Sequence, residues 1–237
     1  MRLALWTPGA RSPGAGLVRA LEAAATLVVV AAEPARRPEV DLDVYHVADD
    51  PAFGFVYRAL LARPGVVWLE AWNLHSLVHA ETAGRGDAER YLREARRAHG
   101  PAGAFVAGQV LRGRGGALIS LLELPDRVLE SALAVVTTQE DVRDRSRGRV
   151  DVPVVLLPAN EDEAADAAAR LLELARGLVS RLPEAARSLR QRREQERRPL
   201  GRALDELRPF ARELGLRGVP AEVARLIAGL LGDSTRP

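Results

Sequence analysis

Acidic side chains gather where two predicted strands end. Asp49 and Asp50 follow the strand Asp43–Val47, and Glu70 directly follows the strand Val66–Leu69. In open parallel sheets, ligands bind at the carboxyl ends of the strands. A carboxylate within hydrogen-bond reach of a substrate hydroxyl can take its proton as a general base. We therefore expect Glu70 to be the catalytic carboxylate, with Asp49 and Asp50 orienting substrate hydroxyls or holding a divalent metal.

Two histidines are candidate partners for Glu70. His46 lies near the end of the first strand, and His75 follows the second strand shortly after Glu70. Trp72 and Asn73 stand between Glu70 and His75 and are candidates for substrate contacts, Trp72 as a stacking platform. The spacing does not decide which imidazole meets Glu70.

Each of these residues also has a structural interpretation. His46 lies on an apolar strand and can be a core histidine, and Asp49-Asp50-Pro51 is a sound turn on local chemistry alone. Trp72 can belong to the core. His75 and His79 are four residues apart, but no third ligand and no H-E-x-x-H motif accompanies them, so we expect these two histidines to bind no metal.

Alternating strands and helices must position these side chains. Short apolar runs bounded by Gly, Pro and acidic turns predict strands, and three- to four-residue apolar spacing between them predicts helices. The predicted strands are Arg2–Trp6, Leu27–Ala32, Asp43–Val47, Val66–Leu69, Ala132–Thr138 and Val152–Leu157. This alternation predicts an α/β domain over residues 1–158, a Rossmann-like doubly wound parallel sheet.

A glycine-rich loop, Thr7–Gly16, follows the first predicted strand. Its glycines do not have the G-x-G-x-x-G spacing of a dinucleotide site, and no G-x-x-x-x-G-K-[ST] motif is present. Gly9, Gly14 and Gly16 therefore either shape a flexible loop above the sheet or cradle a phosphate.

The composition changes after Pro158, and residues 159–237 predict a helical extension. Asn160 to Glu163 has the spacing of a capping box, and the helix after it carries one apolar stripe that needs a surface to cover. Two short helices, Pro199–Leu214 and Pro220–Leu231, follow. The basic run Arg190–Arg198 is either a solvated helix face or a contact for an anionic membrane surface or an acidic partner.

Composition excludes several classes of protein. The 237 residues contain no cysteine, which excludes disulfides and thiolate catalysis. Although there are 34 basic residues, all of them arginine, the net charge is only +2, so we expect no nucleic-acid binding. No apolar run reaches the roughly 18 residues of a membrane span, and the first residues do not resemble a signal peptide. We expect a cytoplasmic protein.

In their order, the motifs resemble the amino-terminal, acceptor-side lobe of two-lobed (GT-B) glycosyltransferases of the large retaining group. The resemblance covers roughly residues 1–158. It is carried by the following segments: Val44-Tyr45-His46, Asp49-Asp50-Pro51, Phe55-Val56-Tyr57, Pro64–Leu69, Asn73-Leu74-His75, His99-Gly100, Ala134–Thr138 and Val152–Pro158. It implies sugar transfer, with Glu70 as the catalytic residue. It also implies that the acceptor lies against Asp49, Asp50, Trp72, Asn73, His75, Gly14 and Gly16.

The departures from that family are specific. Asp49 and Asp50 replace two asparagines, Phe53 replaces a histidine, and Glu70-Ala71 replaces a His-Asp pair. The loop that lies near the acceptor in the family is reduced to Ser12–Gly16.

The chain also lacks the family's second lobe. That lobe binds most of the nucleotide-sugar donor, and the residues after Pro158 are too few to form it. The helix after Glu163 instead resembles the closing helices that such enzymes fold back onto their first lobe.

Two hypotheses follow. In the first, the chain is the acceptor-binding half of a glycosyltransferase and is inactive alone. A donor-lobe protein, or a second copy of the chain, completes it, no cofactor is bound, and a nucleotide-sugar donor binds only with that partner. In the second, the chain is a degenerate, non-catalytic lobe that serves as a binding or scaffolding module through its helical extension.

Overall fold

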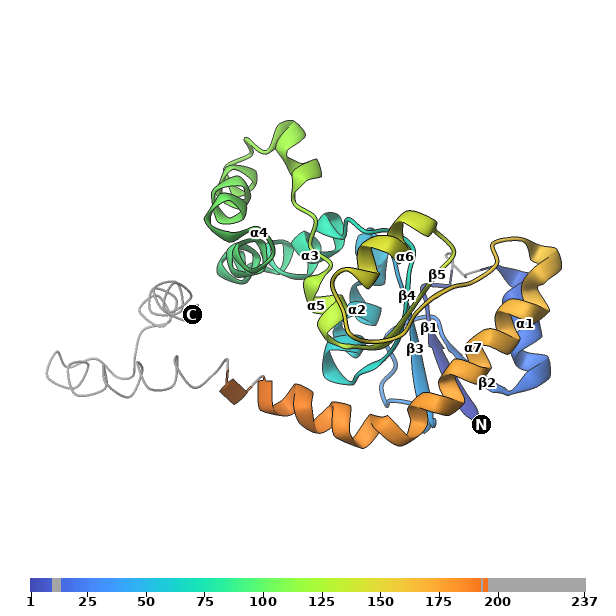
Figure 1. The fold of residues 1–237 in the computed structure, drawn as a ribbon. Coiled ribbons are helices and arrows are strands. Elements are labelled where there is room, and N and C mark those ends of the chain that lie inside the picture. Colours follow the sequence, from blue (N-terminus) through green and yellow to red (C-terminus); the bar gives the residue numbers. More distant parts are fainter. Residues whose placement is uncertain (10–13, 193, 196–237) are drawn as a thin grey trace, which may run out of the picture.

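The computed structural model of the chain describes residues 1–9, 14–192 and 194–195. Its centre is a six-stranded sheet in the order β2-β1-β3-β4-β5-β6, and every pair of neighbouring strands is parallel (Figure 1). The strands are β1 (Arg2–Trp6), β2 (Thr26–Val30), β3 (Leu42–Val47), β4 (Gly65–Leu69), β5 (Ala132–Thr137) and β6 (Val154–Leu156). The predicted Rossmann-like α/β fold is confirmed.

The central strands are mostly apolar because both faces of the sheet are covered. Every residue of β3, β4 and β5 is buried, whereas the edge strands β2 and β6 are only partly buried. Continuous apolar runs are typical of parallel sheets with helices on both faces.

One face of the sheet is covered by α1 (Ala15–Ala24) and α7 (Ala164–Leu178), which pack against each other. The predicted apolar stripe of α7 is buried there, with Leu171 and Ala175 fully inaccessible. Its beginning differs from the prediction. A 3-10 turn, η4 (Glu161–Glu163), precedes α7, and no side chain caps the helix, since the amide of Glu163 donates to the backbone carbonyl of Asn160 instead.

Beyond α7 the described chain continues through η5 (Val179–Arg181) into further helical residues up to 195. Residues 193 and 196–198 of the run Arg190–Arg198 lie outside the described residues, as do the predicted helices Pro199–Leu214 and Pro220–Leu231. Of the glycine-rich loop, residues 10–13 are also outside them.

Helices α2 (Gly54–Ala62), α3 (His75–Glu81), α5 (Asp126–Glu130) and α6 (Glu140–Arg147) pack on the opposite face. Two short 3-10 turns, η1 (Pro51–Phe53) and η2 (Ala83–Arg85), lie beside them. From β1 the chain adds β2 on one side, and it then adds β3 to β6 on the other side, so the order in which strands are added reverses between β1 and β3. The helices α1 and α2 accordingly lie on opposite faces. The reversal marks the topological switch point, where doubly wound folds have their ligand crevice.

A cluster of charged side chains around a buried carboxylate connects β1 and β3. The carboxylate of Asp43 is fully buried on β3, accepts a hydrogen bond of 2.7 Å from Trp6 Nε1, and pairs with Arg37 at 3.0 Å and Arg63 at 3.4 Å. The Arg37 guanidinium also lies over the Trp6 ring and donates to the Tyr45 hydroxyl. This cluster ties β1, β3 and their neighbouring loops together.

Helix α4 (Ala88–Leu111) is bent at Gly100, whose φ of 65° and ψ of −154° are not helical. The bend thus lies at a glycine followed by a proline, a pair that is typical of a helix end. Past it, Gly103 packs so closely on the first half that a Cβ would lie 2.3 Å from the Ala95 carbonyl oxygen. The 3-10 turn η3 (Gly116–Leu121) then follows α4, and both lie beyond α3, away from the strands (Figure 1).

Among the described residues, no helix has both the length and the apolar character that crossing a membrane requires.

Candidate functional site

Three side chains from neighbouring strands form a chain of contacts at the switch point. Thr7 follows β1, His46 lies at the end of β3, and Glu70 follows β4. Thr7 Oγ1 and His46 Nδ1 are hydrogen-bonded at 2.8 Å, and His46 Nε2 lies 2.5 Å from Glu70 Oε1. These strands lie side by side in the order β1-β3-β4, so their carboxyl ends bring the three side chains together.

The three groups differ sharply in exposure. The side chain of His46 is 1% exposed, whereas that of Glu70 is 41% exposed. Thr7 is buried. Glu70 is therefore the group of the three that a ligand in solution meets, and His46 and Thr7 lie behind it.

Packing fixes the imidazole in place. The His46 ring meets Phe53 edge-on with the ring centroids 5.0 Å apart, and Trp68 with centroids 6.0 Å apart. His46 Nε2 is close to Glu70 but has no partner that meets hydrogen-bond angles. The imidazole and the carboxylate are therefore in close contact, without a well-aligned hydrogen bond between them.

The backbone of Glu70 is also held. Its amide donates to the Val47 carbonyl at 3.0 Å, and its carbonyl accepts a hydrogen bond from the Gln139 side chain at the end of β5. Four strand ends thus meet around Glu70.

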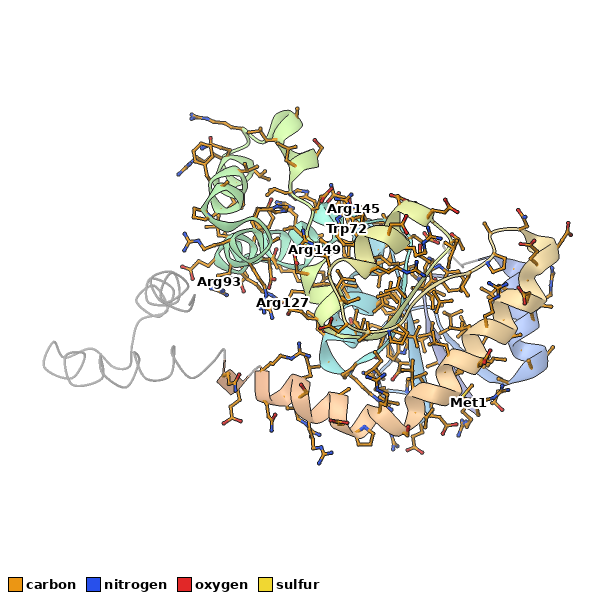
Figure 2. All side chains as sticks on the ribbon, viewed as in Figure 1. Met1, Trp72, Arg93, Arg127, Arg145 and Arg149 are labelled. Atoms are coloured by element: carbon orange, nitrogen blue, oxygen red, sulfur yellow. The ribbon has the colours of Figure 1, made fainter. Side chains whose placement is uncertain are left out.

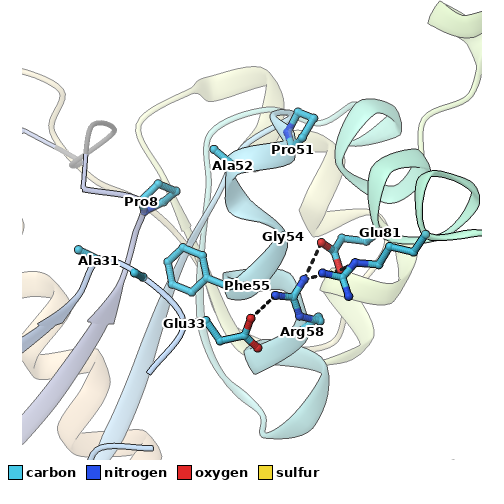
Figure 3. A pocket seen from close by; sticks show the side chains of 11 residues that line it. Pro8, Ala31, Glu33, Pro51, Ala52, Gly54, Phe55, Arg58 and Glu81 are labelled. Atoms are coloured by element: carbon cyan, nitrogen blue, oxygen red, sulfur yellow. Dashed lines mark hydrogen bonds and ion pairs between the residues drawn. The ribbon is translucent and has the colours of Figure 1, made fainter. Parts of the chain in front are cut away.

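An open hollow of about 400 Å³ borders the same two loops (Figure 3). Pro8, one residue after Thr7, and Pro51, one residue after Asp50, both line it. In Figure 3 the guanidinium of Arg58 lies between the carboxylates of Glu33 and Glu81, with 2.5 Å and 2.6 Å between the paired atoms. The hollow therefore has polar groups of both signs.

Gly54 makes that arrangement sterically possible. A Cβ at this position would lie 2.0 Å from Glu81 Oε1, so a larger residue would displace the carboxylate from Arg58.

Asp49 and Asp50 accept hydrogen bonds from backbone amides near the site. Asp49 Oδ1 accepts a hydrogen bond of 3.0 Å from the amide of Leu77 in α3, and Asp50 Oδ1 accepts one of 2.8 Å from the amide of Ala52, at the start of η1. Both lie in the loop after β3, close to the switch point in the chain. Their predicted contact with substrate remains a prediction.

Asn73 and His75 are similarly engaged. Asn73 Oδ1 accepts a hydrogen bond of 2.9 Å from the amide of His75, and His75 Nε2 is bonded to the hydroxyl of buried Tyr91 at 2.6 Å. Of the two histidines considered for Glu70, the structure therefore places His46 beside it and His75 beside Tyr91.

Burial dominates the electrostatics of this second pair. Burial, and then the nearby His79, lower the pKa of His75, against an opposing effect of Asp49. Burial also raises the pKa of Tyr91 to about 12. Both shifts favour the uncharged forms, so the pair is a hydrogen bond between a neutral imidazole and a neutral hydroxyl.

Trp72 belongs to a different cluster (Figure 2). Its indole is buried, donates to Glu123 Oε2 at 3.0 Å, and lies 4.8 Å below the Arg145 guanidinium. Burial would raise the pKa of Glu123, but the hydrogen bonds from Arg145 and Trp72 lower it below its ordinary value. The indole face is covered by Arg145 in this arrangement.

Gly14 and Gly16 lie at the beginning of α1. Gly14 has a φ of 90°, which favours glycine, and its carbonyl accepts from the amide of Val18. Gly16 lies in the first turn of the helix, on the loop that leaves β1. Both are at the carboxyl side of the sheet, as a role near the crevice requires.

Sequence reasoning did not identify Thr7 as a site residue. The signal was its position as the first polar residue after a buried strand, which is where side chains face the crevice. No group of three or more His, Cys, Asp or Glu side chains that could hold a metal occurs in the described part of the chain.

Comparisons with protein-family models, with curated proteins and with solved structures found no match to this chain. Its function must therefore be argued from the site.

Proposed function

We propose that this chain is the acceptor-binding half of a sugar-transfer system, related to glycosyltransferases and completed by a separate donor-binding chain. The observation that supports it best is the Thr7–His46–Glu70 chain at the switch point, in which one carboxylate is exposed to ligand and two buried groups hold it. The ordered motifs that resemble an acceptor-side lobe point to the same chemistry.

In the proposed reaction Glu70 is the general base. A hydroxyl of the acceptor donates a hydrogen bond to the Glu70 carboxylate and transfers its proton to it. The acceptor oxygen then bonds to the anomeric carbon of the donor. The bond from that carbon to the phosphate oxygen breaks, and the nucleoside diphosphate leaves with the electron pair. The partner chain supplies the nucleotide-sugar donor.

His46 and Thr7 act as positioning residues in this scheme. The imidazole sits against one oxygen of Glu70, and the hydroxyl of Thr7 fixes the imidazole from its other side. A general base must be held within hydrogen-bond distance of the proton that it takes, and this support provides that.

The proposal is tested by saturation-transfer NMR of the full chain with a panel of mono- and disaccharides. We expect signals from at least one class of saccharide, reduced about tenfold or more in Glu70→Gln. Glu140→Gln is the matched control, because Glu140 is exposed near the same edge of the sheet. The absence of saccharide signals, or signals that Glu70→Gln leaves unchanged, would contradict the proposal.

Calorimetric titration with UDP, GDP and their sugar conjugates tests whether the donor needs a partner. The half-enzyme proposal expects no binding heat from the isolated chain. Micromolar binding that is lost in Glu70→Gln would instead mean that this single lobe holds the donor.

A non-catalytic binding module is the second candidate. It is favoured by one observation: Asp49, Asp50, Trp72, Asn73 and His75 all make hydrogen bonds within the fold. Under this alternative, sugar transfer by any donor-binding partner is the same with the Glu70→Gln variant as with the wild-type chain.

A further inference from the structure

Exposed apolar side chains are concentrated on one protruding segment. Of seven large hydrophobic residues exposed in the described part of the chain, five lie between Phe105 and Leu121. We call these five the apolar tip: Phe105, Leu111, Leu118, Ile119 and Leu121. Phe105 is 65% exposed and Leu121 is 62% exposed. Clusters of this kind on a soluble surface mark an interaction site.

The bend in α4 presents this segment to the outside. The left-handed φ of Gly100 redirects the helix, and the close approach of Gly103 to Ala95 fixes the second half against the first. The main packing partners of α4 are η2, η3 and α5, and in Figure 1 its second half and η3 stand away from the sheet. The tip is therefore outside the main core.

The charged residues within the segment that carries the tip have a single sign. From Pro101 to Leu122 the only charged residues are Arg112 and Arg114, and both are exposed. No acidic residue lies in this segment, so its formal charge is positive. Apolar side chains with adjacent arginines suit the boundary between lipid headgroups and acyl chains, because the apolar groups insert and the guanidiniums bind phosphates.

A second copy of the chain fits this surface less well. In a two-fold symmetric interface the same patch of both copies is in contact. Arg112 and Arg114 of one copy would then lie near those of the other, and residues 101–122 supply no acidic residue to pair with them.

We propose that the apolar tip inserts into the surface of an anionic membrane, with Arg112 and Arg114 binding lipid phosphates. This proposal does not depend on sugar transfer. It also differs from a membrane contact through Arg190–Arg198, because it assigns binding to η3 and the second half of α4.

The test is sedimentation of the full chain with vesicles of phosphatidylcholine alone, and with about 30% phosphatidylglycerol added. We expect binding to the anionic vesicles only. We expect the binding of two double variants, Phe105→Ser/Leu121→Ser and Arg112→Gln/Arg114→Gln, to be weaker than that of the wild type by about tenfold or more. Val29→Ser, at an exposed apolar residue on β2, and Arg170→Gln/Arg176→Gln, on the outer face of α7, are the matched controls and should bind as the wild type does.

A second variant reports insertion directly. The three native tryptophans are buried, so in Phe105→Trp the exposed indole at the tip dominates any emission change. We expect a blue shift with anionic vesicles and quenching by brominated lipids.

Several results would overturn the proposal. One is the absence of vesicle binding. Another is unchanged binding in both double variants, Phe105→Ser/Leu121→Ser and Arg112→Gln/Arg114→Gln, which would place the contact elsewhere, for example in the arginine-rich run. A dimer in light scattering that the Phe105→Ser/Leu121→Ser variant dissociates, without vesicle binding, would identify a second copy as the occupant. The two proposals fail separately. If the tip variants still give saccharide signals, a negative vesicle result contradicts membrane binding and leaves the sugar-transfer proposal standing.

Discussion

At the scale of single residues, the candidate site depends on how Glu70 is held. Its carboxylate is exposed, but His46 and Thr7 behind it are buried and bonded to each other. If the two are positioning residues, changing them should alter ligand binding through Glu70 even though a ligand does not reach them.

Thr7→Val tests this support. Valine has nearly the shape of threonine but cannot bond His46 Nδ1, so we expect saccharide binding to weaken about three- to tenfold while the fold is retained, a loss of about 1 kcal/mol. Thr7→Ser keeps the hydroxyl and should restore binding. If Thr7→Ser is as weak as Thr7→Val, packing of the methyl group, and not the hydrogen bond, is what matters.

Asp43 should be important for stability and not for binding. Asp43→Ala removes the buried partner of Trp6, Arg37 and Arg63, and we expect it to lower the free energy of unfolding by about 2–3 kcal/mol, since the arginines stay partly solvated. Asp166→Ala, which removes an exposed pair on α7, should change it by about 0.5 kcal/mol or less. Equal effects in urea titrations would show that the Asp43 cluster contributes no more than a surface pair.

His75 should make the fold sensitive to acid. Its pKa is lowered by burial and by His79, from an ordinary value of about 6.5. The unfolded chain then takes up the proton more readily, so the free energy of unfolding falls as the pH drops below about 6.5 and keeps falling until folded His75 is itself protonated.

This linkage is measured by urea unfolding at about pH 7.5 and about pH 5.5. The wild type should lose more stability between the two than His75→Gln, which does not titrate and still offers Tyr91 an acceptor. If both lose the same amount, His75 does not contribute to the acid sensitivity.

At the scale of elements, replacing a helical glycine by alanine should change the stability in opposite directions at two positions. Gly103→Ala forces a Cβ against the Ala95 carbonyl and should destabilise by about 1–3 kcal/mol. Gly177→Ala in α7 has open space around the new Cβ and should stabilise by about 0.5–1 kcal/mol. Thermal unfolding of the two variants checks both signs. A Gly103→Ala protein as stable as wild type would mean that the two halves of α4 do not pack as described.

The elements themselves were well predicted because their signals are local. The predicted strands Asp43–Val47 and Ala132–Thr138 are bounded by turns, and each differs by one residue from the observed strand, β3 or β5. The bend in α4 lies at a Gly-Pro pair, Gly100-Pro101. The beginning of α7 was less well predicted, because a 3-10 turn takes the place of the expected capping box.

Contacts between elements were harder to foresee. Glu70 and His46 were both chosen, but nothing local shows that β1 lies beside β3 and so brings Thr7 to His46. In the same way, Tyr91 and Glu123 are distant in the chain from His75 and Trp72, so the sequence could not reveal that they bind these two side chains inside the fold.

At the scale of the whole molecule, α7 is part of the folded unit and not an appendage. It covers the sheet face formed by Leu5, Val44, Val66 and Trp68, among others. A chain that ends at Pro158 should therefore expose this face, bind the dye ANS and aggregate. A chain that ends at residue 195 keeps α7 and should fold. A monomeric, cooperatively unfolding 1–158 fragment would show that the first lobe is independent of the helix.

The central claim is that a hydroxylated ligand binds beside Glu70 at the switch point. The most direct measurement is the backbone amide NMR spectrum of the full chain, recorded with the saccharide panel. We expect shifts that concentrate at Thr7–Gly9, Ala48–Asp50 and Glu70–Ala71, and that disappear in Glu70→Gln. Shifts confined to another part of the chain, or none with any saccharide, would contradict the claim.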